Sequence, residues 1–222
     1  ADDLCVVNSM HCSNSRHGGA VLEWHTGTDT FIRPSLGSWV TYGLGSENQD
    51  LPGYITICQA LSQGGANNFG SAFLPAAFQG TPLGSGGVAA SEALIPFIRG
   101  KNPRHLQQLE LEMLQKMAAT QRQQSGPDPQ GAARLASFEL ALRMQNEAPL
   151  AQDLASESAA THQLYGLNDP DTEDFGRQCL MARRFAERGV RFVQCNSNGW
   201  DHHSQLEQGM TNMCRAVDQP IA

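Results

Sequence analysis

Residues 188–203 have the sequence Arg188-Gly189-Val190-Arg191-Phe192-Val193-Gln194-Cys195-Asn196-Ser197-Asn198-Gly199-Trp200-Asp201-His202-His203. After the glycine, β-branched and aromatic residues alternate with polar ones as far as Gln194, which predicts a strand. The strand leads into a small polar loop that ends in one carboxylate and two imidazoles. Such a loop is a candidate metal site or acid/base site.

The rest of the chain predicts an α/β fold. Apolar runs with strand character occur at residues 3–10 and 54–58, and amphipathic patterns predict helices at residues 20–25, 34–45, 104–124, 132–163 (interrupted near Pro149), 174–188 and after His203. Residues 59–103 are rich in Gly, Ala, Ser, Asn and Pro, which predicts a long loop. This order of strands and helices is typical of a mostly parallel sheet with helices on its faces.

Both ends of the chain are abrupt. A strand is expected almost at the first residue, and the last helix runs to the final residue without a capping signal. We therefore expect one α/β domain over residues 1–222 that is incomplete at both ends. Residues 104–163 form a helical insertion or an outer helical pair within it.

Composition excludes some classes of partner. The net charge is −7, from 22 acidic and 15 basic residues, so the overall field repels phosphate backbones and argues against a nucleic-acid partner. No run approaches the ~18 apolar residues of a membrane-spanning helix. The six cysteines contain no C-x-x-C pair, and both free thiols and disulfides remain open.

The candidate site residues are histidines and one aspartate. Asp201 and His203 fall on the same side of an extended segment and could share one cation, at the ~2.0–2.2 Å typical of zinc with N/O ligands. Alternatively, Asp201 is the N-cap of a helix at residues 204–213, with His202 and His203 solvated. His11 and His17 flank an earlier polar loop, where each could bind a metal, act as an acid/base group or hydrogen-bond to the backbone.

Three strings carry a resemblance to a known family. They are Arg33-Pro34-Ser35-Leu36-Gly37-Ser38-Trp39-Val40-Thr41-Tyr42-Gly43-Leu44-Gly45-Ser46-Glu47-Asn48, then Phe73-Leu74-Pro75-Ala76-Ala77-Phe78-Gln79-Gly80-Thr81, then Gly189-Val190-Arg191-Phe192-Val193 followed by Gly199-Trp200-Asp201-His202-His203. In this order they resemble a bacterial domain-of-unknown-function family that is often labelled sulfatase. That family is grouped with the alkaline phosphatase and sulfatase superfamily.

The resemblance implies a three-layer α/β/α sandwich with a mostly parallel, alkaline-phosphatase-like sheet. It implies a metal-dependent hydrolase of a phosphate or sulfate ester on a small molecule or glycan, with Asp201 and His203 as ligands of zinc, calcium or manganese. It also implies export to the periplasm or the cell exterior. The oligomeric state is left open.

The chain departs from the superfamily at the nucleophile. The position nine residues before Thr26, where a hydroxyl residue is expected, is His17, and Cys12 lacks the following proline of the sulfatase motif. An activated water is therefore the expected attacking group, with His17 or His11 as the acid/base. The alternative is a catalytically inactive member of the fold that binds an anionic carbohydrate or a partner protein.

Overall fold

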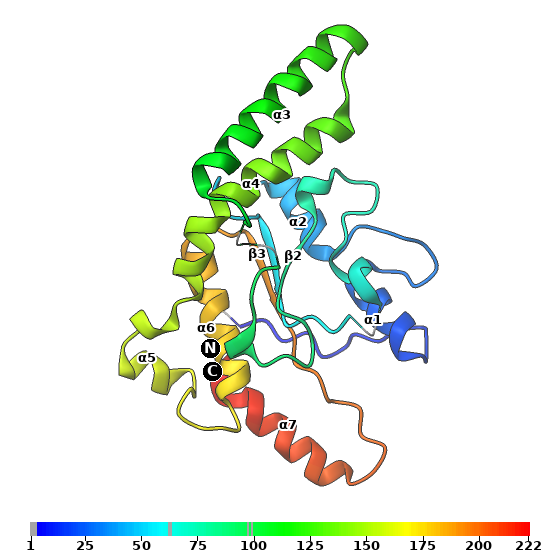
Figure 1. The fold of residues 1–222 in the computed structure, drawn as a ribbon. Helices are drawn as coiled ribbons and strands as arrows, with labels where there is room; N and C mark the ends of the chain where they lie inside the picture. The colour runs from blue at the N-terminus through cyan, green and yellow to red at the C-terminus, as the bar shows by residue number, and fades with distance from the viewer. Residues whose placement is uncertain (1–3, 62–63, 97, 99) are drawn as a thin grey trace.

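A small parallel sheet lies at the centre of the chain (Figure 1). The computed structural model describes residues 4–222 except 62, 63, 97 and 99. Its strands are β1 (Tyr54–Ile57), β2 (Thr81–Leu83) and β3 (Phe192–Cys195), in the order β2-β1-β3. Both neighbours run parallel to β1, and Ile55 is in register with Thr81 on one side and Val193 on the other. The expected α/β class with a parallel sheet is confirmed.

Seven α-helices occur in the described part of the chain. They are α1 (His17–Thr26), α2 (Leu36–Leu44), α3 (Arg104–Ser125), α4 (Pro129–Gln152), α5 (Ala159–Leu164), α6 (Glu173–Glu187) and α7 (Leu206–Ile221). α4 continues through Pro149 instead of breaking there, and α5 is a separate short helix. None of the helices that the structure describes is long and apolar enough to cross a membrane.

Successive side chains of β1 point to opposite faces of the sheet, so the two faces of this strand contact different parts of the protein. Ile55 and Ile57 are fully buried in the main core, together with Leu180 and Phe185 of α6. Tyr54 points to the opposite face, where its ring packs edge-on against Phe192 with 5.2 Å between the centroids. α2 covers this pair, and its Gly37 is so close that an added Cβ would lie 2.6 Å from the Tyr54 ring.

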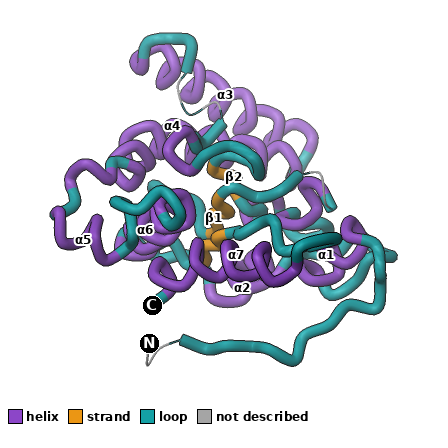
Figure 2. Tube along the Cα trace, turned by 90° about the horizontal axis from the view of Figure 1, so that it is seen from below, coloured by secondary structure: helices purple, strands orange, loops and turns teal. Residues whose placement is uncertain are grey.

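The strand predicted at residues 3–10 is absent, and this prediction was wrong. Residues 4–10 are exposed and have no regular secondary structure, and residue 3 lies outside the described residues. Figure 2 shows the segment as part of a long loop that leads to α1. An apolar run becomes a strand only where a neighbouring strand accepts and donates its backbone hydrogen bonds.

The third strand instead comes from the region predicted as a long loop. β2 is only three residues long and contains Pro82, which weakens any strand pattern in the sequence. It lies at the edge of the sheet, where one side needs no hydrogen-bond donor, so a proline is tolerated there.

Candidate functional site

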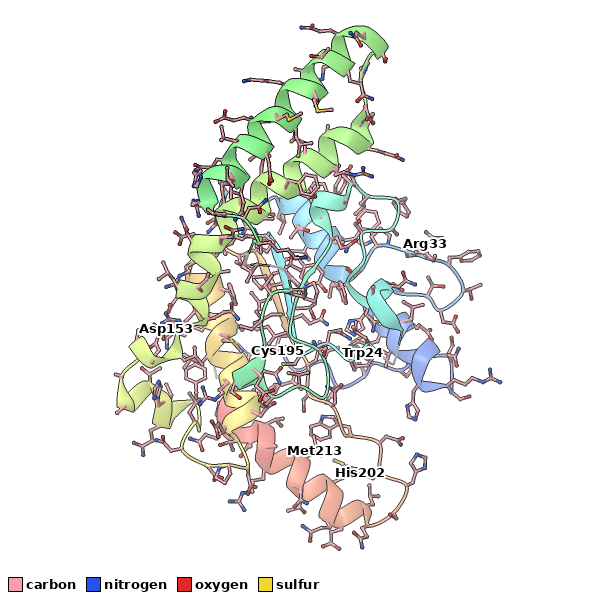
Figure 3. The ribbon with its side chains drawn as sticks, viewed as in Figure 1. Trp24, Arg33, Asp153, Cys195, His202 and Met213 are labelled. Atoms are coloured by element: carbon pink, nitrogen blue, oxygen red, sulfur yellow. The ribbon has the colours of Figure 1, made fainter. Side chains whose placement is uncertain are left out.

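A cleft of about 800 Å³ lies beyond the carboxyl ends of the strands. Gln59 follows β1 and Asn196 follows β3, and both line the cleft. α1 forms one wall and the loop from Cys195 to Asp201 forms another, as the labelled Trp24 and Cys195 indicate in Figure 3. Ligand sites of parallel α/β sheets lie at this edge, because all strands end there.

Three ligand-type side chains meet at the rim of this cleft. Asp201 Oδ2 lies 2.9 Å from His17 Nε2 and 2.8 Å from His203 Nε2. One ligand atom from each of the three residues lies within 4.8 Å of the others. The side chains are 59%, 51% and 83% exposed for His17, Asp201 and His203. We call these three residues the His-Asp-His cluster.

Local contacts hold His17 at the first turn of α1. Ser13 donates its backbone N–H and its hydroxyl to the Glu23 carboxylate, both at 3.0 Å, which ties the preceding loop to the helix. These bonds also lower the pKa of Glu23. The Asn14 side chain accepts from the backbone N–H of Arg16 at 2.8 Å, next to the start of the helix. His17 is thus the first residue of a helix whose entry is tethered.

The loop that carries Asp201 has its own constraints. Gly199 has φ of +97°, which a residue with a Cβ would adopt only under strain. Trp200 Nε1 donates to the Ser197 hydroxyl at 3.1 Å across this turn. The turn aims Asp201 toward α1.

The structure does not support the capping role of Asp201. The N-cap residue of α7 is Gln205, and the carboxylate of Asp201 is hydrogen-bonded to the histidines instead. His202 is outside the cluster: its ring lies against Gly209 of α7, and its Nε2 has no hydrogen-bond partner among the described residues. Asp201 and His203 thus present their ligand-type atoms to each other, and their role as metal ligands stays a prediction.

The two predicted acid/base histidines have different surroundings. His17 lines the cleft and contacts Asp201, whereas His11 is exposed and is not among the residues that line the cleft. The catalytic role of either residue stays a prediction. Geometry places His17, and not His11, beside Asp201 and His203, so of these two histidines only His17 is a possible third metal ligand of the cluster.

Several cleft residues were missed by the sequence analysis. Trp24 and His25 of α1 line the cleft beside His17. Burial lowers the pKa of His25, which favours its neutral form. The spacing of seven from His17 to Trp24 places both on one face of a helix and could have identified the tryptophan. Nothing in the local pattern separated His25 from an ordinary packed residue.

Two thiols at the carboxyl ends of β1 and β3 have raised pKa values. Cys195 lines the cleft, and a hydrogen bond with the Cys179 thiol, together with burial, raises its pKa. Burial also raises the pKa of Cys58 to about 11. All six cysteines are free in the structure. Because the thiolate is the reactive form, Cys195 and Cys58 are poor nucleophiles at neutral pH.

Comparison with known proteins assigns a family and nothing finer. The family model described as "Protein of unknown function (DUF1501)" matches residues 1–222. No curated protein and no solved structure matches the chain.

Proposed function

The chain belongs to the DUF1501 family of proteins of unknown function, and we propose that it is a metal-dependent hydrolase that acts on a phosphate or sulfate ester. The observation that carries this proposal is the convergence of His17, Asp201 and His203 at the rim of the cleft. We further propose that its fold is the three-layer, alkaline-phosphatase-like sandwich. In support, α2 and α6 pack on opposite faces of β1.

The donor set of the cluster fits a divalent transition metal. Two imidazole nitrogens and one carboxylate oxygen suit zinc or manganese better than calcium, which prefers oxygen ligands throughout. Tetrahedral ligands at ~2.1 Å from zinc are about 3.4 Å apart, slightly more than the 2.8 and 2.9 Å seen here. The side chains are exposed and can separate by this amount at little cost.

Three protein ligands leave an open coordination position, as in catalytic zinc sites. A bound cation would polarise the ester oxygen and lower the pKa of a water molecule. The remaining groups of the cleft suit water as the attacking group. The Cys195 thiol of the cleft is held protonated, and the Ser197 hydroxyl accepts from Trp200. In this proposal His17 is a ligand, and the neutral His25 is the imidazole available to accept a proton.

The test is direct measurement of metal binding. We expect one zinc or manganese ion per chain by calorimetric titration and elemental analysis. His17→Ala, Asp201→Asn and His203→Ala should each weaken binding at least tenfold. His105→Ala is the matched control, because His105 is an exposed histidine on α3, outside the cluster. Wild-type levels of binding in the cluster variants, or no binding in the wild type, would refute the ligand assignment.

Activity is then assayed with aryl phosphate and aryl sulfate esters, with and without the metal. We expect hydrolysis of one ester class that depends on the metal and is lost in Asp201→Asn. Metal binding without hydrolysis of either ester would favour a protein that retains the fold and only binds its ligand.

A further inference from the structure

A series of hydrogen-bonded amide side chains lies at the carboxyl ends of β1 and β3. Asn196 Nδ2 donates to the backbone carbonyl oxygen of Ile57 at 2.9 Å. Gln194 Nε2 donates to Asn196 Oδ1 at 3.1 Å and to Gln59 Oε1 at 2.8 Å. Thr56 also donates its hydroxyl to Gln59 Oε1, at 3.3 Å. We call Asn196, Gln194 and Gln59 the amide relay.

The amide relay fixes which way each of its side chains points. A backbone carbonyl oxygen can only accept, so the atom of Asn196 that faces Ile57 is its amide nitrogen. The oxygen of Asn196 then faces Gln194 and accepts from the Gln194 nitrogen. That same nitrogen requires an acceptor at Gln59, which is the Gln59 oxygen. The relay therefore holds the oxygen of the Gln59 amide and leaves its nitrogen over.

The amide nitrogen of Gln59 lacks a partner in the protein. Gln59 Nε2 donates to no residue that the structure describes, although Gln59 is only 3% exposed. Gln59 lines the cleft, so the surface that remains to this nitrogen is toward the cleft. A buried N–H group without an acceptor is destabilising, and natural proteins rarely keep one. The cleft must supply the acceptor, either as a water molecule or as an oxygen of a bound ligand.

Gln59 and the His-Asp-His cluster lie at different depths of the same cleft. The cluster side chains are at least 51% exposed and form part of the rim, whereas Gln59 is almost fully buried inside. An ester that is bound at the cluster by its anionic group can therefore extend its alcohol part inward, toward Gln59.

The charges of the cleft indicate which kind of oxygen Gln59 binds. The described residues that line the cleft include no lysine or arginine. One neutral N–H group does not offset the cost of burying a fully charged oxygen. It does satisfy a hydroxyl, ether or carbonyl oxygen, whose burial costs much less.

We propose that Gln59 is a substrate-binding residue, whose Nε2 donates to an uncharged oxygen on the alcohol part of the ester. This inference rests on the proposed function, which places the ester group at the cluster. Preferred substrates carry a hydroxyl, ether or carbonyl oxygen in their alcohol part, and simple alkyl or aryl esters are poorer substrates. The preference is strong because a substrate without that oxygen leaves the buried donor unpaired.

Two sets of phosphate and sulfate monoesters test this proposal on the zinc-loaded chain. The alcohol part carries hydroxyl oxygens in the first set (glycerol and glucose esters) and none in the second (butyl and phenyl esters). We expect kcat/KM to be at least about tenfold higher for the best ester of the first set. Gln59→Met removes the donor and should lower kcat/KM for that ester about tenfold, mainly by raising KM. For the second set the change should stay within about twofold.

A second variant and a control separate binding from folding. Gln59→Glu also removes the N–H group, but its carboxylate can still accept from Thr56 and Gln194, so it should show the same loss with the relay intact. Gln108→Met is the control, because Gln108 is an exposed residue of α3 that does not line the cleft. Zinc binding and the thermal unfolding curve should match the wild type in the control and in at least one Gln59 variant.

The outcomes distinguish this proposal from the proposed function. An equal loss for both sets, or an unchanged preference in the Gln59 variants, overturns the role of Gln59 and leaves the metal site standing. If no ester is hydrolysed, the proposed activity fails, and calorimetric titration with the same esters makes the same comparison by affinity. In that titration, no binding of the first set, or equal binding by the wild type and the Gln59 variants, overturns the role of Gln59.

Discussion

The Nε2 atom of His17 lies 2.9 Å from the Oδ2 atom of Asp201, although the two residues belong to opposite ends of the chain. One begins α1, and the other precedes α7. The His-Asp-His cluster therefore exists only in the folded chain. Any ion that it binds stabilises the folded state at the expense of the unfolded one.

Zinc should raise the melting temperature of the chain. At a free concentration 100 times the dissociation constant, binding contributes about 2.7 kcal/mol, which corresponds to roughly 5 to 10 °C for a domain of this size. The shift is measured by differential scanning calorimetry with and without zinc, and a chelator should reverse it. His17→Ala should abolish the shift, although it leaves Asp201 and His203 in place. If the His17→Ala variant showed the full zinc-induced rise in melting temperature, the metal ligands would be Asp201 and His203 alone.

Stability should fall as the pH is lowered through the titration range of His25. Burial lowers the pKa of this imidazole in the folded chain below 6.5, so the unfolded chain binds the proton first. The stabilising contribution is complete above about pH 7 and is lost as the pH falls through 6.5 toward the folded pKa. His25→Gln should flatten this part of the profile, as measured by urea unfolding at pH 5.5, 6.5 and 7.5. An unchanged slope would show that His25 is hydrated in solution.

Gly176→Ala should destabilise the chain by about 3 kcal/mol. A Cβ at this buried position of α6 would lie 2.0 Å from the carbonyl oxygen of Tyr165, and a backbone atom cannot rotate out of the way. Gly43→Ala in α2 is the matched control, because a Cβ there meets nothing within 4 Å. It should stabilise the chain by about 0.4 to 1 kcal/mol. Denaturant midpoints measure both, and equal effects would contradict the close approach at Gly176.

Arg184→Met should cost about 3 to 5 kcal/mol. The guanidinium is only 9% exposed, donates to the carbonyl oxygens of Ala151 and Leu150 at the end of α4, and pairs with Glu157. Its loss leaves these acceptors unpaired and separates α4 from α6.

The neighbouring Arg183 provides the control for this change. It is 37% exposed and pairs with Glu187 at 2.8 Å and with Glu157 at 3.4 Å, so Arg183→Met should cost about 0 to 1 kcal/mol. Arg184 lowers the pKa of Glu157, so their pairing stabilises the chain above about pH 4.5 and weakens as the pH falls through the folded pKa. The difference between the free energies of unfolding of the Arg184→Met and Arg183→Met variants should therefore become smaller at acid pH. Urea unfolding at neutral and acid pH measures it.

Elements with a strong local pattern were predicted well. β1, β3 and α6 lie within one to four residues of their predicted ends, because alternation and helical period are properties of neighbouring residues. β2 and the false strand at residues 3–10 show the opposite case. Whether a short segment becomes a strand depends on the edge it meets, and that edge comes from a distant part of the chain.

By itself, the sequence determined the α/β class and the strand that leads to the site, and it placed Asp201 and His203 close enough to share a ligand, since each depends on residues a few positions apart. Only the tertiary structure decided that His17 joins them, that Gln205 and not Asp201 caps α7, and that His25 lines the same cleft. These relationships depend on how the packing of α1 and α7 around the parallel sheet places segments from both ends of the chain. No local pattern encodes that placement.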